Sequence, residues 1–238
     1  MNVPVRGTSV RKIYMTERIW TILIDALPKM VEYGLKVTMP LTVLSFSLAL
    51  VISVIVALIQ YAHIPVLKQL CRVYIWIIRG TPLLVQLFLV FYGLPYLGIQ
   101  LDAYPTAVLV FGFNEAAYMA ESLRGALEAV PKGQLEAGLC VRMSYIKIMW
   151  HIVLPQAFRT AFPALSNSLI AMVKGTSLAA TITVTEMFRQ AQVINARVYE
   201  PLALYTECAL VYLFFCSVLT ILQRVIEKRL NHYGGNKA

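Results

Sequence analysis

Three ionisable side chains stand alone inside long apolar stretches of this chain. Glu115, Lys174 and Glu207 each occur in a different stretch. An enzyme within a membrane would need a nucleophile, a base and an orienting group at a common depth. Single groups in separate stretches provide no such set, so we do not expect an enzyme. Because a charge in hydrocarbon is costly unless it is paired or hydrated, Glu115 and Lys174 are candidates for a polar path.

The cysteines and histidines do not form a metal-ligand pattern. No CxxC pair occurs, and the histidines have no ligand-like spacing to the cysteines or to each other. The residues concerned are Cys71, Cys140, Cys208, Cys216, His63, His151 and His232. The phosphate-binding pattern GxxxxGK[ST] is also missing from the sequence. We therefore expect this chain to hold no metal, nucleotide or other cofactor.

The composition indicates an integral membrane protein. Charged residues make up 14% of the 238 residues and hydrophobic residues 59%, whereas about a quarter of the residues of a soluble domain are charged. The net charge of +9 could suggest a nucleic-acid partner. In so apolar a chain, however, a basic excess more often marks cytoplasmic loops that face anionic membrane lipid. We expect lipid contact and no nucleic acid.

The apolar stretches predict an all-α fold with about five transmembrane helices, because about 20 residues cross the hydrocarbon as a helix. The expected spans are 37–61, 82–100, 103–122, 160–185 and 201–223, within a transmembrane domain over 34–225. The preceding segment 1–33 is expected to be a tail whose residues 17–33 form a helix lying in the membrane interface, since that helix is too polar to cross. Residues 226–238 form the expected C-terminal tail.

The distribution of cations predicts the orientation of the chain. Five spans place the loops after the first and third spans on the same side as the C-terminal tail, and most Lys and Arg residues outside the N-terminal segment lie there. The positive-inside rule makes this side cytoplasmic and places the N-terminus outside. The basic N-terminal tail runs against the same rule. A cleaved signal peptide is not expected, because no short apolar core precedes the first span.

The segment 131–155 is too polar for lipid and is expected to form two short helices in the cytoplasm. Ile146, Met149, Trp150 and Val153 recur at positions i, i+3, i+4 and i+7 of the second helix. This periodicity predicts an apolar stripe that needs a cover. Lipid headgroups and a groove of another protein are both compatible with it.

The same segment resembles the EAA loop of ABC-importer permeases. Its spacing matches the family pattern throughout: Glu136, Ala137 and Gly138, then Arg142, then Ile152, Val153, Leu154 and Pro155. Gly138 stands where a second Ala is usual, and Arg142 stands where Gly is usual. The resemblance implies that Glu136, Ala137, Gly138, Arg142, Ile152, Leu154 and Pro155 couple this chain to ATPase subunits.

Three further segments extend the resemblance to the polar amino-acid, HisM/GlnP-like branch of these permeases. They are Arg79-Gly80-Thr81-Pro82-Leu83-Leu84-Val85-Gln86, Ala117-Tyr118-Met119-Ala120-Glu121 with Arg124, and Lys174-Gly175-Thr176-Ser177-Leu178. In the last segment Gly175 replaces the Asp that is usual in the family. The general pattern is nearest to that of cystine-type permeases.

The resemblance implies the type I importer architecture and a set of partners. ATP-Mg would be hydrolysed on two separate ABC ATPase subunits, and a second permease chain, identical or paralogous, would complete the path. An extracytoplasmic binding protein would deliver an amino acid to the complex in the bacterial cytoplasmic (inner) membrane. A passive channel or a membrane assembly protein without an ATPase is the alternative, but it leaves the patterned loop unexplained.

Two groups of residues have an expected role in transport or in structure. Those expected along the translocation path are Glu115, Lys174, Gly175, Thr176 and Ser177, although Lys174 could instead extend to the membrane surface along a tilted helix. Those expected to be structural or to form a gate are Arg79, Gly80, Thr81, Pro82, Glu121 and Arg124. Within this group, Glu121 and Arg124 have the i, i+3 spacing of an ion pair on a helix surface.

Overall fold

The computed structural model describes residues 7–62 and 65–232, and every regular element in those residues is helical. The expected all-α fold is confirmed for this part of the chain. The expected tails over 1–33 and 226–238 fall partly outside the described residues, at positions 1–6 and 233–238. The elements in chain order are α1 (Gly7–Tyr33), η1 (Gly34–Thr38), α2 (Met39–Tyr61), α3 (Pro65–Gly80), α4 (Leu83–Phe88), η2 (Leu89–Gly93), η3 (Leu94–Leu97), α5 (Ala103–Glu128), α6 (Lys132–Cys140), α7 (Tyr145–Ile148), η4 (Met149–Val153), α8 (Leu154–Gly175), η5 (Thr176–Ile182), α9 (Met187–Val198) and α10 (Pro201–His232).

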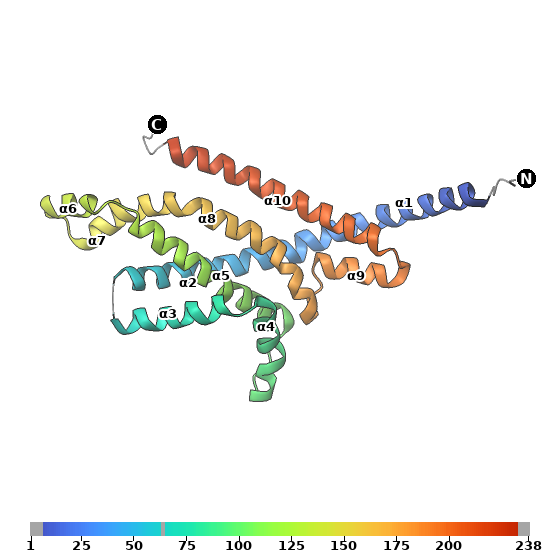
Figure 1. Ribbon diagram of the computed structural model, residues 1–238, viewed down its shortest axis with the longest axis horizontal. Coiled ribbons are helices and arrows are strands. Elements are labelled where there is room, and N and C mark those ends of the chain that lie inside the picture. The colour runs from blue at the N-terminus through green and yellow to red at the C-terminus, as the bar shows by residue number, and fades with distance from the viewer. Residues whose placement is uncertain (1–6, 63–64, 233–238) are drawn as a thin grey trace, which may run out of the picture.

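The bundle has two distinct ends. Helices α2, α3, α5, α8 and α10 run along its length, and α6 and α7 form one tip (Figure 1). The C-terminal part of α10 points toward this tip, whereas α1 extends from the opposite end, near α9. By length and apolar composition, two of the described helices can cross a membrane, or four if each of two bent helix pairs counts as one span. The expected span over 103–122 corresponds to α5, which does not pass this criterion and whose middle carries Asn114 and Glu115.

The first span is part of a much longer helix than expected. Residues Glu17–Tyr61 form one continuous helix of 45 residues, roughly 67 Å long, whereas the hydrocarbon is about 30 Å thick. Ala26 and Met30 are buried in a cluster with residues of α9 and α10. The separate interfacial helix expected over 17–33 is therefore not present, because this segment packs on protein and continues into α2.

Helices α2 and α5 pack closely over most of their length. Small buried residues recur at every fourth position, namely Ser45, Ala49, Ser53 and Ala57 on α2 and Gly112, Ala116 and Ala120 on α5. Such residues let two helix backbones approach closely in a membrane. A methyl group added at Gly112 would lie 2.7 Å from Leu48. Helices α3 and α8 pack against this pair.

A sharp bend lies at the beginning of the expected span over 82–100. The structure pairs Leu83–Leu97 with Pro65–Gly80, and the two parts are bent by 103°. Pro82, in an extended conformation, separates α3 from α4, since proline has no N–H with which to continue the helix. The bend thus precedes the expected span over 82–100, of which residues Leu83–Leu97 are helical. The longitudinal helix at this place is α3, which carries Lys68, Arg72 and Arg79.

The side chain of Gln86 forms hydrogen bonds across the bend between α3 and α4. The Gln86 amide donates hydrogen bonds to the carbonyl of Ile78 (2.9 Å) and to the carbonyl and hydroxyl of Thr81 (3.2 and 2.7 Å). Its oxygen accepts a hydrogen bond of 2.9 Å from Asn114 of α5. Gln86 thus satisfies carbonyl groups that the break at Pro82 leaves without helical partners, and it ties the bend to the α2–α5 pair.

The second bend lies between α8 and α9. Helix α8 tightens into the 3-10 turn η5, and Thr183 then adopts a left-handed conformation with φ of 70°. The two arms of this pair are bent by 51°. The expected span over 160–185 thus corresponds to most of α8 followed by η5, and α9 packs against α1 and α10.

We predict that Gln86→Leu lowers the stability of the protein. The substitution keeps the approximate size of the side chain but leaves the amide of Asn114 and the carbonyl of Ile78 without this partner, which costs roughly 1–3 kcal/mol. The measurement is the thermal unfolding temperature of the purified protein in detergent. Gln69→Leu, at an exposed position of α3, is the matched control. Equal unfolding temperatures for the two variants would contradict the role of Gln86.

Candidate functional site

The expected loop over 131–155 forms a compact helical hairpin at the tip of the bundle. Helix α6 ends at a turn in which the N–H of Met143 donates to the carbonyl of Gly138 (3.0 Å) and that of Arg142 to the carbonyl of Leu139 (2.9 Å). Ser144 then precedes α7, which continues through the wide turn η4 into α8. Two short helices are therefore present, as the sequence predicts, and the second one leads directly into a long helix of the bundle.

Gly138 allows the two short helices to touch. A methyl group added at Gly138 would lie 2.7 Å from Cγ1 and 2.9 Å from Cδ1 of Ile148. Ile148 is fully buried and belongs to the core cluster that α2, α5 and α8 share. The glycine at this position of the motif, where alanine is usual, thus accompanies a bulky Ile148 that fills the space. It positions α6 directly against the core.

Arg142 occupies the sharp turn of the hairpin in a left-handed conformation, with φ of 58°. A side chain with a Cβ atom pays for this conformation with roughly 1 kcal/mol relative to glycine. The turn thus has the backbone shape that a glycine favours, although the sequence places arginine there. The Arg142 side chain is exposed.

The loop presents acidic and apolar side chains outward. Glu136 and Ala137 are exposed on α6, and Pro155 is exposed at the start of α8, whereas Ile152 and Leu154 are half-buried. The apolar stripe expected on the second helix is divided by the turn η4. Ile146 and Trp150 are 78% and 70% exposed, while Val153 is buried and Met149 half-buried. Part of the stripe therefore anchors the loop to the bundle, and part lies open at its surface.

The three isolated ionisable residues do not meet. Glu115 of α5 forms a side-chain hydrogen bond with Ser168 of α8. Lys174 at the end of α8 is exposed and has no ion pair with another described residue. Glu207 lies in a groove between α1 and α10, where its Oε2 atom is buried and has no hydrogen-bond partner among the described residues. Lys174 and Glu115 therefore do not pair within one chain.

Lys174 lines an open cavity of about 550 Å³ beside α10. The other lining residues are Ser177, Phe188, Tyr205, Cys208, Ala209, Tyr212, Leu213 and Cys216. The hydroxyl of Ser177 donates to the carbonyl of Lys174 (2.8 Å), and that of buried Thr176 donates to the carbonyl of Val173 (2.6 Å). Gly175 has no neighbouring atom within 4 Å of an added methyl group. After Gly175 the winding changes from the α-helix α8 to the 3-10 helix η5, and the sharp break follows at Thr183.

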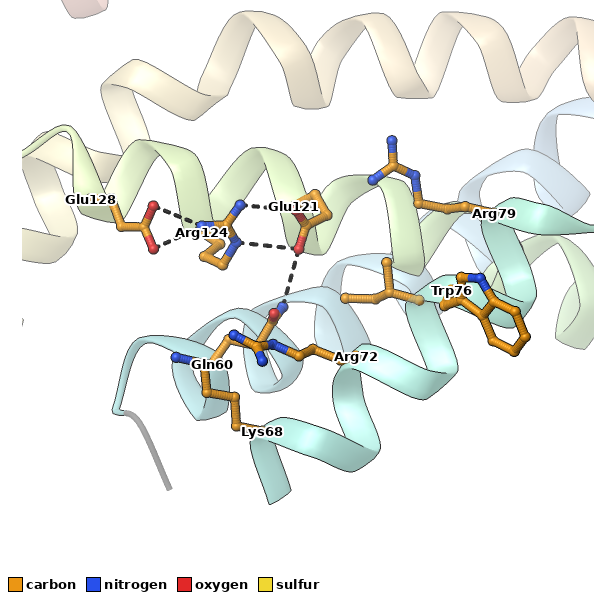
Figure 2. Close-up of a pocket in the computed structure, with 9 residues that line it drawn as sticks. Gln60, Lys68, Arg72, Trp76, Arg79, Glu121, Arg124 and Glu128 are labelled. Atoms are coloured by element: carbon orange, nitrogen blue, oxygen red, sulfur yellow. Dashed lines mark hydrogen bonds and ion pairs between the residues drawn. The ribbon is translucent and has the colours of Figure 1, made fainter. Parts of the chain in front are cut away.

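The expected ion pair of Glu121 and Arg124 is formed. The guanidinium of Arg124 donates to Glu121 (2.9 Å) and, on its other side, to Glu128 (2.7 Å), as Figure 2 shows. Glu121 also accepts a hydrogen bond of 3.4 Å from Gln60 of α2. The three charged residues form a chain along the last turns of α5, directly before the hairpin.

The residues at the bend between α3 and α4, Arg79 to Pro82, are exposed. The guanidinium of Arg79 lies 5.2 Å from the centre of the Tyr118 ring, a distance at which a cation and an aromatic ring attract each other. The hydroxyl of Thr81 donates to the carbonyl of Ile77 (2.9 Å). Gly80 has open space where a side chain would begin.

Two polar side chains that position these segments, one half-buried and one buried, were assigned no role from the sequence. One is Gln86. The other is Glu186, which is fully buried, caps α9 by accepting hydrogen bonds from the N–H groups of Phe188 (2.8 Å) and Arg189 (2.7 Å), and accepts a further one from the hydroxyl of Tyr212 (2.8 Å). The only local signals are a glutamine four residues after Pro82 and an acidic residue directly before an amphipathic stretch.

Comparison with known proteins gives a consistent result. A family model described as binding-protein-dependent transport system inner membrane component matches residues 49–232. The L-cystine transport system permease protein TcyB of Bacillus subtilis (strain 168) is 42% identical over 95% of this chain and 94% of its own length. The glutamine transport system permease protein GlnP of Escherichia coli (strain K12) is 33% identical over 89% of this chain and 97% of its own. A chain from the crystal structure of an amino acid ABC transporter with histidines has a TM-score of 0.75, with 29% identity over 96% of this chain and 100% of that chain.

We predict that Gly138→Ala destabilises the hairpin and that Ile148→Ala reverses part of this effect. Overlap with Ile148 costs roughly 1–3 kcal/mol, more than the gain of up to about 1 kcal/mol in helix propensity. Removing the Ile148 side chain costs about 2–5 kcal/mol by itself, but the new methyl group then occupies part of the space. The double variant should unfold at a higher temperature than the sum of the single effects implies.

The matched control for this double-mutant cycle is Gly133→Ala in the same short helix, where an added methyl group has no neighbour within 4 Å. This control should be neutral or slightly stabilising. Additive effects of Gly138→Ala and Ile148→Ala would show that the contact does not hold the hairpin.

Proposed function

The chain belongs to the family of binding-protein-dependent transport system inner membrane components, and from this we propose that it is one permease subunit of an ATP-driven importer for polar amino acids. It is a multi-pass protein of the inner membrane and a transport component, not an enzyme. Related permeases named for cystine, glutamine and arginine support the substrate class. The 42% identity to a cystine permease over nearly the whole chain favours the cystine type.

The helical hairpin α6–α7 is the observation that carries the coupling role. It is a rigid projection at one tip of the bundle, with Glu136, Ile146 and Trp150 exposed at its surface. An amphipathic helix of this kind fits a groove of a protein partner. We assign the groove to an ABC ATPase subunit. Two such subunits, which bind and hydrolyse ATP-Mg, would each hold the hairpin of one permease chain. A passive channel or an assembly protein would have no use for this projection.

The hairpin is built so that its displacement moves the bundle. Helix α5 enters it, α8 leaves it, and Ile148 and Val153 are buried in the core that these helices share with α2. Because a packed core does not deform continuously, a pull on the hairpin by closing ATPase subunits would tilt α5 and α8 as rigid bodies. This tilt is the proposed step between the inward-open and outward-open states.

The cavity beside Lys174 is the proposed part of the translocation path. It combines one exposed ammonium group, which would meet the carboxylate of an amino acid, with the hydroxyl group of Tyr205, which would meet its polar groups. The cavity is open on one side. A second permease chain, identical or paralogous, would close it, and Glu115 would line the path from the α5 side.

The coupling role also sets the orientation that we propose. ATPase subunits act in the cytoplasm, so the tip with α6 and α7 would be cytoplasmic, together with the C-terminal end of α10. The beginning of α1 would lie outside, where an extracytoplasmic binding protein delivers the amino acid. Arg79, Gly80, Thr81 and Pro82 would then form a bend inside the membrane, and Glu121 and Arg124 would lie near its cytoplasmic surface.

We predict that Glu136→Arg abolishes coupled transport. A bulky cation in place of an exposed carboxylate should weaken binding of the hairpin to its ATPase by at least about tenfold if this residue lies in the interface. The measurement is amino-acid uptake and ATP hydrolysis in proteoliposomes that contain both permease chains, the ATPase subunits and the binding protein. Uptake should be lost, and hydrolysis should no longer respond to the binding protein.

The control for Glu136→Arg is Glu227→Arg, the same charge reversal near the end of α10 but outside the hairpin. It should leave uptake nearly unchanged, and both variants should insert into the membrane normally. Full uptake by Glu136→Arg would refute the docking role.

We predict that the cavity beside Lys174 is wet, so that its thiol Cys216 reacts with a charged, membrane-impermeant thiosulfonate reagent. A thiol that faces lipid reacts poorly, because the thiolate is the reactive form and hydrocarbon disfavours it. Labelling is measured by mass spectrometry in proteoliposomes, and Cys216→Ser should remove the signal. Absence of labelling at Cys216 in both the resting and the transporting complex would exclude this cavity from the path.

A further inference from the structure

One face of α3 carries three cationic side chains. Lys68, Arg72 and Arg79 are spaced by four and seven residues, which places them on the same side of the helix. Ile75, on this side, is buried against α2 and α5. The cations therefore point into the space between α3 and its two neighbours.

This space is an open cavity of about 390 Å³ near the tip that bears the hairpin (Figure 2). Its lining comes from the end of α2, from α3 and from the end of α5, and consists of Gln60, Lys68, Arg72, Ile75, Trp76, Arg79, Glu121, Arg124 and Glu128. Four of these side chains are cationic and two are anionic. The cavity thus has an excess of positive charge.

Among the described residues, the two carboxylates form ion pairs with Arg124 and none with the cations of α3. Glu121 and Glu128 both bind the guanidinium of Arg124, at 2.9 and 2.7 Å. Within the described residues, Lys68 and Arg72 have neither an ion pair nor a side-chain hydrogen bond, and Arg79 has its contact with the Tyr118 ring. Two adjacent cations therefore lie at the cavity with no anion bound.

The outer side of the same helix is apolar. Val73, Trp76 and Ile77 are 42%, 75% and 48% exposed. Trp76 joins the two sides, because it also lines the cavity. A ligand that fits both sides has a compact anionic group and a long apolar part.

We propose that the cavity between α2, α3 and α5 binds the phosphate group of an anionic phospholipid, with Lys68 and Arg72 on the phosphate and the acyl chains along Val73, Trp76 and Ile77. Arginine can hold a phosphate through two parallel hydrogen bonds, and lysine adds a point charge. Basic pockets between helices on the cytoplasmic side of a membrane are suited to such headgroups. The lipid would hold α3 beside the charged chain at the end of α5.

The test uses Trp76 as the reporter. Trp20→Phe and Trp150→Phe leave Trp76 as the only tryptophan of the full-length chain, since the sequence has three. This protein is reconstituted into phosphatidylcholine bilayers that contain a small, equal fraction of brominated phosphatidylglycerol or brominated phosphatidylcholine. Bromine quenches tryptophan on contact. Quenching by the anionic lipid should exceed quenching by the neutral one, with a relative affinity of at least about fivefold.

Lys68→Gln with Arg72→Gln should bring this ratio close to one. Arg224→Gln with Lys228→Gln is the matched control, because these two exposed cations are also four residues apart in the C-terminal half of α10 but line no described cavity. The control should keep the ratio of the parent protein. An equal ratio in the Lys68/Arg72 variant and the parent overturns the proposal.

Two further outcomes would also overturn it. If millimolar inorganic phosphate, compared with chloride at equal ionic strength, relieves the quenching by phosphatidylglycerol, the site takes free phosphate in preference to lipid. If neither brominated lipid quenches Trp76, another protein chain covers this side of α3. The expected result is quenching by the anionic lipid that phosphate does not relieve.

Discussion

The close approach of α2 and α5 is the constraint on which the other elements depend. Lipid offers little hydrophobic drive for two helices to pair, so their contact relies on small residues that allow backbone to approach backbone. Ser45, Ala49 and Ser53 provide this on α2, and Gly112 and Ala116 on α5. Once the pair is fixed, its flanks determine the places of α3 and α8, and the end of α5 determines where the hairpin projects.

Breaks in the helices are possible because polar side chains replace the missing backbone partners. Gln86 does so at the bend between α3 and α4, and Glu186 at the start of α9. In each case the side chain also binds a neighbouring helix, through Asn114 of α5 or Tyr212 of α10. Irregular backbone within a membrane protein needs such internal partners, since lipid provides none. The bends therefore interrupt individual helices and at the same time hold neighbouring helices together.

The hairpin is packed directly against the core of the bundle. Ile148 sits under Gly138 on one side and within the core of α2, α5 and α8 on the other. A partner that holds the exposed Ile146 and Trp150 would therefore act on residues only two positions away from the core. The proposed lipid site lies on the same end of α5, which places lipid, hairpin and core in a position to influence one another.

The membrane class, the all-α fold, the hairpin and the family could be predicted from the sequence, because hydropathy and motif spacing are local properties of the chain. It also predicted the ion pair of Glu121 and Arg124, whose partners are one helical turn apart. Only the tertiary structure decided that residues 17–33 pack on α9 and α10, that the helix breaks at Pro82, and that Lys174 and Glu115 stay apart within one chain. It also decided that Gly138 faces Ile148 and that Lys68 and Arg72 meet the end of α5 in one cavity. These outcomes depend on contacts between residues distant in sequence, and periodicity along one helix carries no information about which neighbour that helix will meet.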